Sequence, residues 1–90
     1  MTRSDPDEGA WRSEQIETAV REIERYLLAH PNASDTLQGV QDWWLAGLAT
    51  TPSLEVVQAA LDRLVDAGVV AGRPVPGGIV YRRVRQEDRV

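Results

Sequence analysis

The chain has 90 residues, a formal net charge of −4 and no cysteine, which excludes disulfides and thiolate metal sites. Its single histidine, His30, leaves no basis for a His-rich metal cluster or for a Ser-His or Cys-His catalytic pair. We therefore expect one small non-enzymatic domain with no metal, no cofactor and no small-molecule substrate.

Charge is distributed unevenly along the chain. Residues 1–68 contain 12 carboxylates and 5 arginines, whereas residues 69–90 contain 5 arginines and 2 carboxylates. This differs from the uniformly basic surface of a strong nucleic-acid binder. The apolar runs are far shorter than the roughly 20 residues of a membrane span, and the first residues lack the apolar run of a signal peptide. A cytoplasmic protein that does not enter membranes is the expectation.

The tails and the first helix are predicted from polarity and periodicity. Residues 1–12 predict a disordered N-terminal tail, residues 13–84 a folded domain and residues 85–90 a disordered C-terminal tail. Ser13 is the expected N-cap of the first helix, which should end at His30, because the proline that follows disfavours helical geometry. Apolar residues recur at helical spacing between these two positions: Ile16, Val20, Ile23 and Leu27.

A short second helix is predicted from a capping box, in which Asp35 is the N-cap and Gln38 reaches back to it. Gly47 is its expected stop. Gly39, inside this helix, indicates either the close approach of a neighbouring helix or a tolerated loss of about 1 kcal/mol relative to alanine. The apolar face consists of Leu37, Val40, Trp44 and Leu48.

The third helix is expected to begin at Thr51 and Pro52, with threonine as the N-cap and proline at the first helical position. It should end at Gly68. Its predicted buried stripe contains Val57, Ala60, Leu61, Leu64 and Val65. Its outer face carries the carboxylates Glu55, Asp62 and Asp66.

Two strands are predicted after the third helix. Residues 69–73 and 79–84 have strand composition, and the Pro- and Gly-rich residues 74–78 between them indicate a hairpin turn. Because side chains alternate across a strand, Tyr81 is expected to point into the core alongside Ile79.

One pattern runs from the third helix into the hairpin. It begins with VQAALDRLVDAGVV over residues 57–70 and continues with Arg73, Gly77, Gly78, Ile79 and Tyr81. The pattern resembles the second half of a bacterial winged-helix domain. In that superfamily, a helix ending in Leu-x-x-x-Gly-hydrophobic leads into a glycine-tipped hairpin that closes with a tyrosine. The resemblance covers roughly residues 13–84. The chain is similar to a small stand-alone member of the superfamily.

The resemblance implies a mainly α fold with a small β-hairpin, in the order helix, helix, helix, strand, strand. It also implies that the third helix is the recognition helix and the hairpin the wing. Neither implication fixes a function, because one fold serves many functions.

DNA binding is one hypothesis. On the third helix, Gln58 could read adenine and Arg63 guanine, although the three carboxylates share this face and DNA-binding relatives often carry arginines at the positions of Gln58 and Ala59. The arginines of the wing could hold phosphates, or they could instead keep an edge hairpin from aggregating. These arginines are Arg73, Arg82, Arg83 and Arg85.

Binding to a protein is the other hypothesis. Trp43 and Trp44 are adjacent and point roughly 100° apart on a helix, so that Trp44 continues the core stripe and Trp43 lies at its edge. Trp43 could anchor a protein interface, or it could cover the core beneath the loop over residues 48–51. Trp11 could likewise be an anchor or a lid on the first helix. The expected apolar neighbours of Trp43 on the third helix are Leu54, Val56 and Ala59.

The acidic third helix favours the protein hypothesis. We therefore predict a non-enzymatic adaptor that docks on a protein partner or a larger assembly. The alternative is a DNA-binding transcriptional regulator that uses the basic wing.

Overall fold

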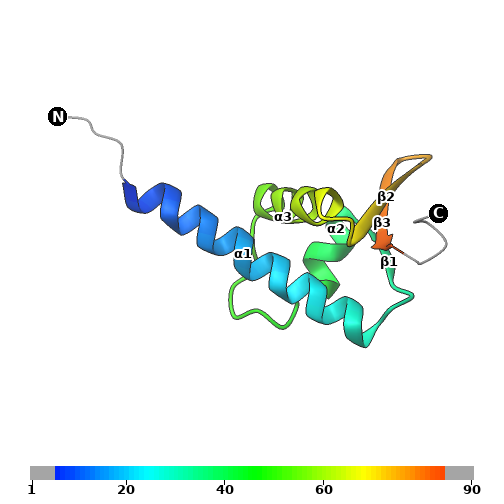
Figure 1. Ribbon diagram of the computed structural model, residues 1–90, viewed down its shortest axis with the longest axis horizontal. Helices are drawn as coiled ribbons and strands as arrows, with labels where there is room; N and C mark the ends of the chain where they lie inside the picture. Colours follow the sequence, from blue (N-terminus) through cyan, green and yellow to red (C-terminus); the bar gives the residue numbers. More distant parts are fainter. Residues whose placement is uncertain (1–5, 85–90) are drawn as a thin grey trace.

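A computed structural model describes residues 6–84, with side chains from Trp11 onward. In chain order, its elements are helix α1 (Pro6–Ala29), strand β1 (Ser34–Thr36), helix α2 (Leu37–Gly39), π-helix η1 (Val40–Trp44), helix α3 (Leu54–Asp66) and strands β2 (Val70–Val75) and β3 (Gly78–Arg83). Figure 1 shows α1 and α3 packed together, with the sheet at one end of the pair. The expected helices and hairpin are present, and β1 adds a third strand that was not predicted.

Helix α1 begins well before the expected N-cap Ser13. Residues 6–12, which were expected to be a disordered tail, are helical from Pro6 onward. Proline suits the first position of a helix, because its missing N–H would have no intrahelical partner there. The predicted end is confirmed, since the helix stops at Ala29 and the His30 N–H donates to the Tyr26 carbonyl oxygen at 2.8 Å.

The second helical segment has a different N-cap from the expected one. The Thr36 side-chain oxygen accepts the Gly39 N–H at 3.2 Å, which makes Thr36 the cap. Asp35 instead lies in β1, where it pairs with Tyr81. Gln38 does not reach back, because its side-chain amide donates to side chains of the following turn. The N-cap is therefore Thr36, one residue after the predicted Asp35, because Asp35 belongs to strand β1.

The same segment ends in a π turn at Trp44, before the expected stop at Gly47. The Leu45 N–H donates to the carbonyl oxygen of Val40, five residues earlier, at 3.1 Å. As a result, Trp44 and Leu45 both lie in the core, each 1% exposed. Trp43, which directly precedes them, is 67% exposed. The core position of Trp44 is confirmed.

Helix α3 begins at Leu54 instead of Pro52, because the Ser53 hydroxyl oxygen accepts the Val56 N–H and caps the helix. Its orientation also differs from the prediction. Val56 was expected outside and is 4% exposed, whereas Val65 was expected inside and is 40% exposed. The inward face is centred near Ala60 and Leu64, so Val56 points into the core and Val65 towards solvent. The buried residues of this face are Val56, Val57, Ala60, Leu61 and Leu64.

The antiparallel sheet has the order β1-β3-β2, so that β3 is central. Its two hairpin strands extend further towards the turn than expected, which leaves the turn at residues 76–77. The burial of Tyr81 is confirmed at 5% exposure, but Ile79 on the same face is 47% exposed. Ile79 is the second residue of β3, next to the turn, and the turn end of the hairpin projects beyond the helices (Figure 1).

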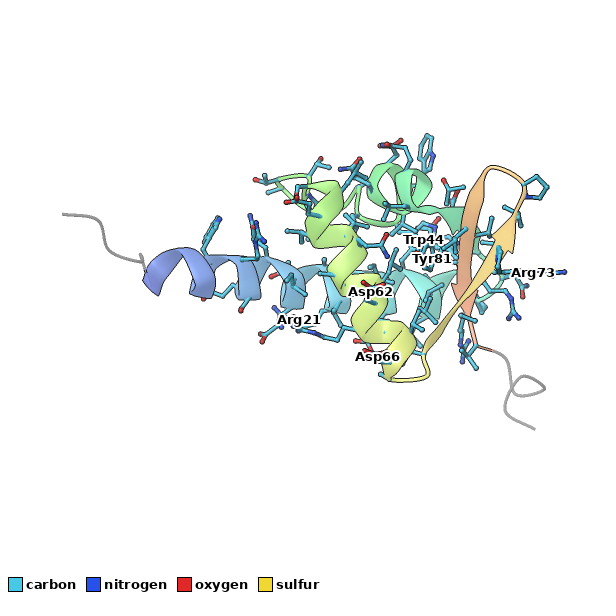
Figure 2. All side chains as sticks on the ribbon, turned by 90° about the horizontal axis from the view of Figure 1, so that it is seen from above. Arg21, Trp44, Asp62, Asp66, Arg73 and Tyr81 are labelled. Atoms are coloured by element: carbon cyan, nitrogen blue, oxygen red, sulfur yellow. The ribbon has the colours of Figure 1, made fainter. Side chains whose placement is uncertain are left out.

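The core lies between α1, η1, α3 and the sheet, and Figure 2 shows Trp44 and Tyr81 pointing into this space. Tyr26 of α1 stacks on Trp44, with the ring centroids 5.4 Å apart and the planes inclined by 12°. Within residues 6–84, no helix combines the length and the apolar character needed to cross a bilayer.

Candidate interaction surfaces

The outer face of α3 is acidic. Glu55, Asp62 and Asp66 are all exposed on it, and Arg63 is its exposed cation. Figure 2 shows Asp62 and Asp66 projecting from α3. The helix that the sequence resemblance assigns to recognition therefore presents mainly negative charge to an approaching molecule.

Gln58, the proposed adenine reader, is engaged within the molecule. Its Nε2 atom donates to Asp62 Oδ1 at 2.9 Å and to the Tyr81 hydroxyl oxygen at 3.1 Å. An amide nitrogen carries two hydrogens, so both donors are used. Bidentate recognition of adenine needs one of these donors together with the amide oxygen. Gln58 links α3 to β3 and would have to break one of these bonds to contact a base.

The structure divides the wing arginines between the two faces of the hairpin. Arg73 of β2 pairs with Val80, which lies two residues from Arg82 on β3, so Arg73 and Arg82 share the outer face. Arg83 lies on the other face, near the end of the strand, and is exposed. Figure 2 shows Arg73 pointing away from the helices. The fourth predicted residue, Arg85, lies outside the described residues.

The predicted apolar interface is partly present. Trp43 is 67% exposed and Leu54 is 40% exposed, while Ala59 is half-buried. Val56 does not belong to this surface, because the rotation of α3 places it in the core. An exposure of 67% also argues against Trp43 as a cover for the core.

A groove along α1 was not predicted. It has a volume of about 610 Å³ and lies between α1 and the loop that joins η1 to α3, which contributes Leu48 and Pro52. Trp11 was the one large apolar residue in the sequence that could have indicated this groove, but residues 1–12 were predicted to be a disordered tail. From α1 the groove is lined by Trp11, Glu14, Gln15, Glu17, Thr18 and Arg21.

The described part of the chain, residues 6–84, contains no group of three or more His, Asp or Glu side chains placed to hold a metal ion. Comparisons with protein-family models, with curated proteins and with solved structures found no match.

Proposed function

We propose that the chain is a non-enzymatic winged-helix interaction module that docks on a protein partner or a larger assembly. The order of the elements supports the winged-helix part of the proposal, because β1 lies between the first two helices and pairs with β3 of the hairpin. Under this proposal, α3 would be the recognition helix and the β2-β3 hairpin the wing.

The observation that carries the choice of a protein partner is the acidic outer face of α3. A carboxylate and a phosphate 4 Å apart repel each other by about 1 kcal/mol even in water. This face carries three exposed carboxylates, those of Glu55, Asp62 and Asp66, and one exposed arginine of α3, Arg63. The donors of Gln58 are used internally as well. A recognition helix of this composition disfavours entry into a DNA groove.

A partner that binds Trp43, Leu54 and the acidic outer face of α3 would need an apolar pocket surrounded by basic residues. Trp43 supplies a large side chain that is 67% exposed, and Leu54 lies at the start of α3, against which η1 packs. Exposed tryptophans are enriched among the residues that dominate binding energy. The carboxylates of α3 would then pair with cations at the rim of the contact.

The test is to recover the partner from the native cell with the full chain, and to repeat the recovery with Trp43→Ala. We expect the variant to lose the partner, because truncation of an interface anchor costs at least about 2 kcal/mol. Leu28→Ala is the matched control: Leu28 is 78% exposed but lies near the C-terminal end of α1. Retention of the partner by Trp43→Ala would overturn the assigned surface.

Binding to DNA through the wing is the second candidate. It is favoured by one observation, the placement of Arg73 and Arg82 on the same outer face of the hairpin. Arginines on one face could contact successive phosphates, and such binding would weaken steeply as the salt concentration rises.

A further inference from the structure

Strand β2 forms one edge of the sheet. The order β1-β3-β2 gives it a partner only on the β3 side within residues 6–84. The turn end of the hairpin projects beyond the helices, so another chain can approach it there (Figure 1). The free edge of a strand carries backbone N–H and C=O groups, which can pair with a strand of a second molecule.

The register of β2 with β3 decides which backbone groups face this edge. The Val84 N–H donates to the Val69 carbonyl oxygen at 2.9 Å, so these two residues form a hydrogen-bonded pair just before β2. In an antiparallel ladder, such pairs alternate with pairs that exchange no hydrogen bond. The next hydrogen-bonded pairs are therefore those of Ala71, Arg73 and Val75. The residues between them turn their N–H and C=O groups to the free edge, and these are Val70, Gly72 and Pro74.

Pro74 interrupts this edge. Proline has no backbone N–H, and its ring occupies the position from which the hydrogen would point. Gly72 and Pro74 are both exposed, so the edge is open to solvent at these two positions. A strand that approaches β2 would meet the N–H and C=O of Gly72 and then a proline ring in place of the next donor.

A second copy of β2 would otherwise be a suitable partner for this edge. An antiparallel pairing about a twofold axis at Gly72 sets Gly72 against Gly72, and Pro74 against Val70 of the other copy. Each contact between Pro74 and Val70 then lacks one hydrogen bond and presses the ring against a carbonyl oxygen. The hairpin also exposes apolar surface here, because Ile79, which pairs with Pro74, is 47% exposed. Apolar surface beside an open edge favours aggregation unless the edge is interrupted.

We propose that Pro74 prevents copies of the chain from joining edge to edge through β2. The missing donor and the ring act together, at one of the three positions whose backbone groups face outwards. This role does not rest on the function proposed above, because it requires neither a protein partner nor DNA.

The test restores the missing donor. Pro74→Val supplies a backbone N–H together with a side chain that suits a strand. Each pair of copies gains two hydrogen bonds, so we expect association to become at least about tenfold tighter than that of the natural chain, which is about 1.4 kcal/mol. Pro74→Thr restores the same donor with a more polar side chain and should behave alike. Analytical ultracentrifugation of the full chains measures the association.

The matched control differs from Pro74→Val only in the donor. A chain with N-methylvaline at position 74, made by chemical synthesis, keeps the valine side chain and lacks the N–H. It should associate no more tightly than the natural chain. Equal association of the N-methylated chain and Pro74→Val would assign the effect to the side chain and overturn the role of the missing donor.

Amide hydrogen exchange, followed by NMR, locates the contact. In the natural chain the Gly72 N–H faces solvent and should exchange rapidly, whereas the Arg73 N–H is bonded to β3 and should be protected. In the associated Pro74→Val chain, the Gly72 N–H should become protected as well. Protection of Arg73 in each variant shows that the hairpin is intact.

Two results would overturn the proposal. One is a pair of variants, Pro74→Val and Pro74→Thr, that keep the hairpin and associate no more tightly than the natural chain. The other is a Gly72 amide that still exchanges rapidly in an associated variant, because the copies would then be joined by another surface.

Discussion

The indole Nε1 of Trp44 donates a hydrogen bond to the Oδ2 atom of Asp35, at 3.2 Å. This bond joins the second helical segment to strand β1, which is the shortest strand of the sheet. Gly39 makes it possible, because a Cβ atom at this position would overlap the Asp35 carboxylate. The close approach that glycine indicated in the sequence is therefore made by a side chain of β1 and not by a neighbouring helix.

This relationship predicts coupled effects of substitutions at Asp35 and Gly39. Asp35→Ala should lower the free energy of unfolding by about 1–3 kcal/mol, because it leaves the buried Trp44 N–H without its acceptor. Gly39→Ala should also destabilise the fold, since the added methyl group displaces the same carboxylate. In the double variant the carboxylate is absent, so we expect the combined loss to be smaller than the sum of the single losses. Urea denaturation of all four chains measures the coupling, and additive losses would contradict it.

The two adjacent tryptophans should respond differently to truncation. Trp44→Ala removes a core side chain and should cost about 3–5 kcal/mol. Trp43→Ala should change the free energy of unfolding by no more than about 0.5 kcal/mol, because its side chain is mostly in solvent. Urea denaturation distinguishes them, and a large loss for Trp43→Ala would mean that this residue supports the core.

The hydroxyl of Tyr81 should contribute to stability through Gln58. Tyr81→Phe keeps the buried ring and removes the acceptor of the 3.1 Å bond from Gln58 Nε2. We expect a loss of about 0.5–1.5 kcal/mol in the free energy of unfolding. In the background of Gln58→Ala, the same change should cost much less. An equal cost in both backgrounds would place the contribution of the hydroxyl elsewhere.

Binding to a random DNA duplex at physiological salt should be no tighter than the non-specific range, with a Kd of ~10⁻⁴ to 10⁻⁶ M. Replacing Arg73 and Arg82 together by alanine should abolish whatever binding is seen, because these two arginines share the outer face of the hairpin. Asp62→Asn with Asp66→Asn should instead strengthen it, because two phosphate-repelling charges are removed from α3. Fluorescence anisotropy over a salt series measures these affinities. Sequence-specific nanomolar binding by the natural chain would favour the DNA regulator over the adaptor.

The sequence predicted the features that depend on long, regular patterns. The apolar stripe of the first helix, which includes Ile23 and Leu27, the hairpin and the burial of Tyr81 all follow from periodicity and turn composition. Strand β1 was missed because three residues are too few to display an alternating pattern, and its side chains also satisfied a capping box. The start of α1 was missed because polar residues that would be solvated in a tail are equally solvated on a helix.

The candidate surfaces were predicted less completely. The exposure of Trp43 followed from its position beside Trp44, but Val56 was misplaced, because the inward face of α3 was centred on the wrong row of side chains. The groove beside Trp11 depends on the loop that follows η1, and no local pattern in the sequence specifies where that loop packs.

The π turn of η1 contains one residue more than an α-helical turn would need. Val40, Trp44 and Leu45 are all buried, and the hydrogen bond from the Leu45 N–H to the Val40 carbonyl oxygen closes the turn that they share. The wide turn therefore places a 67% exposed tryptophan directly beside two core side chains, so that the surface at Trp43 can be altered without removing a residue from the core.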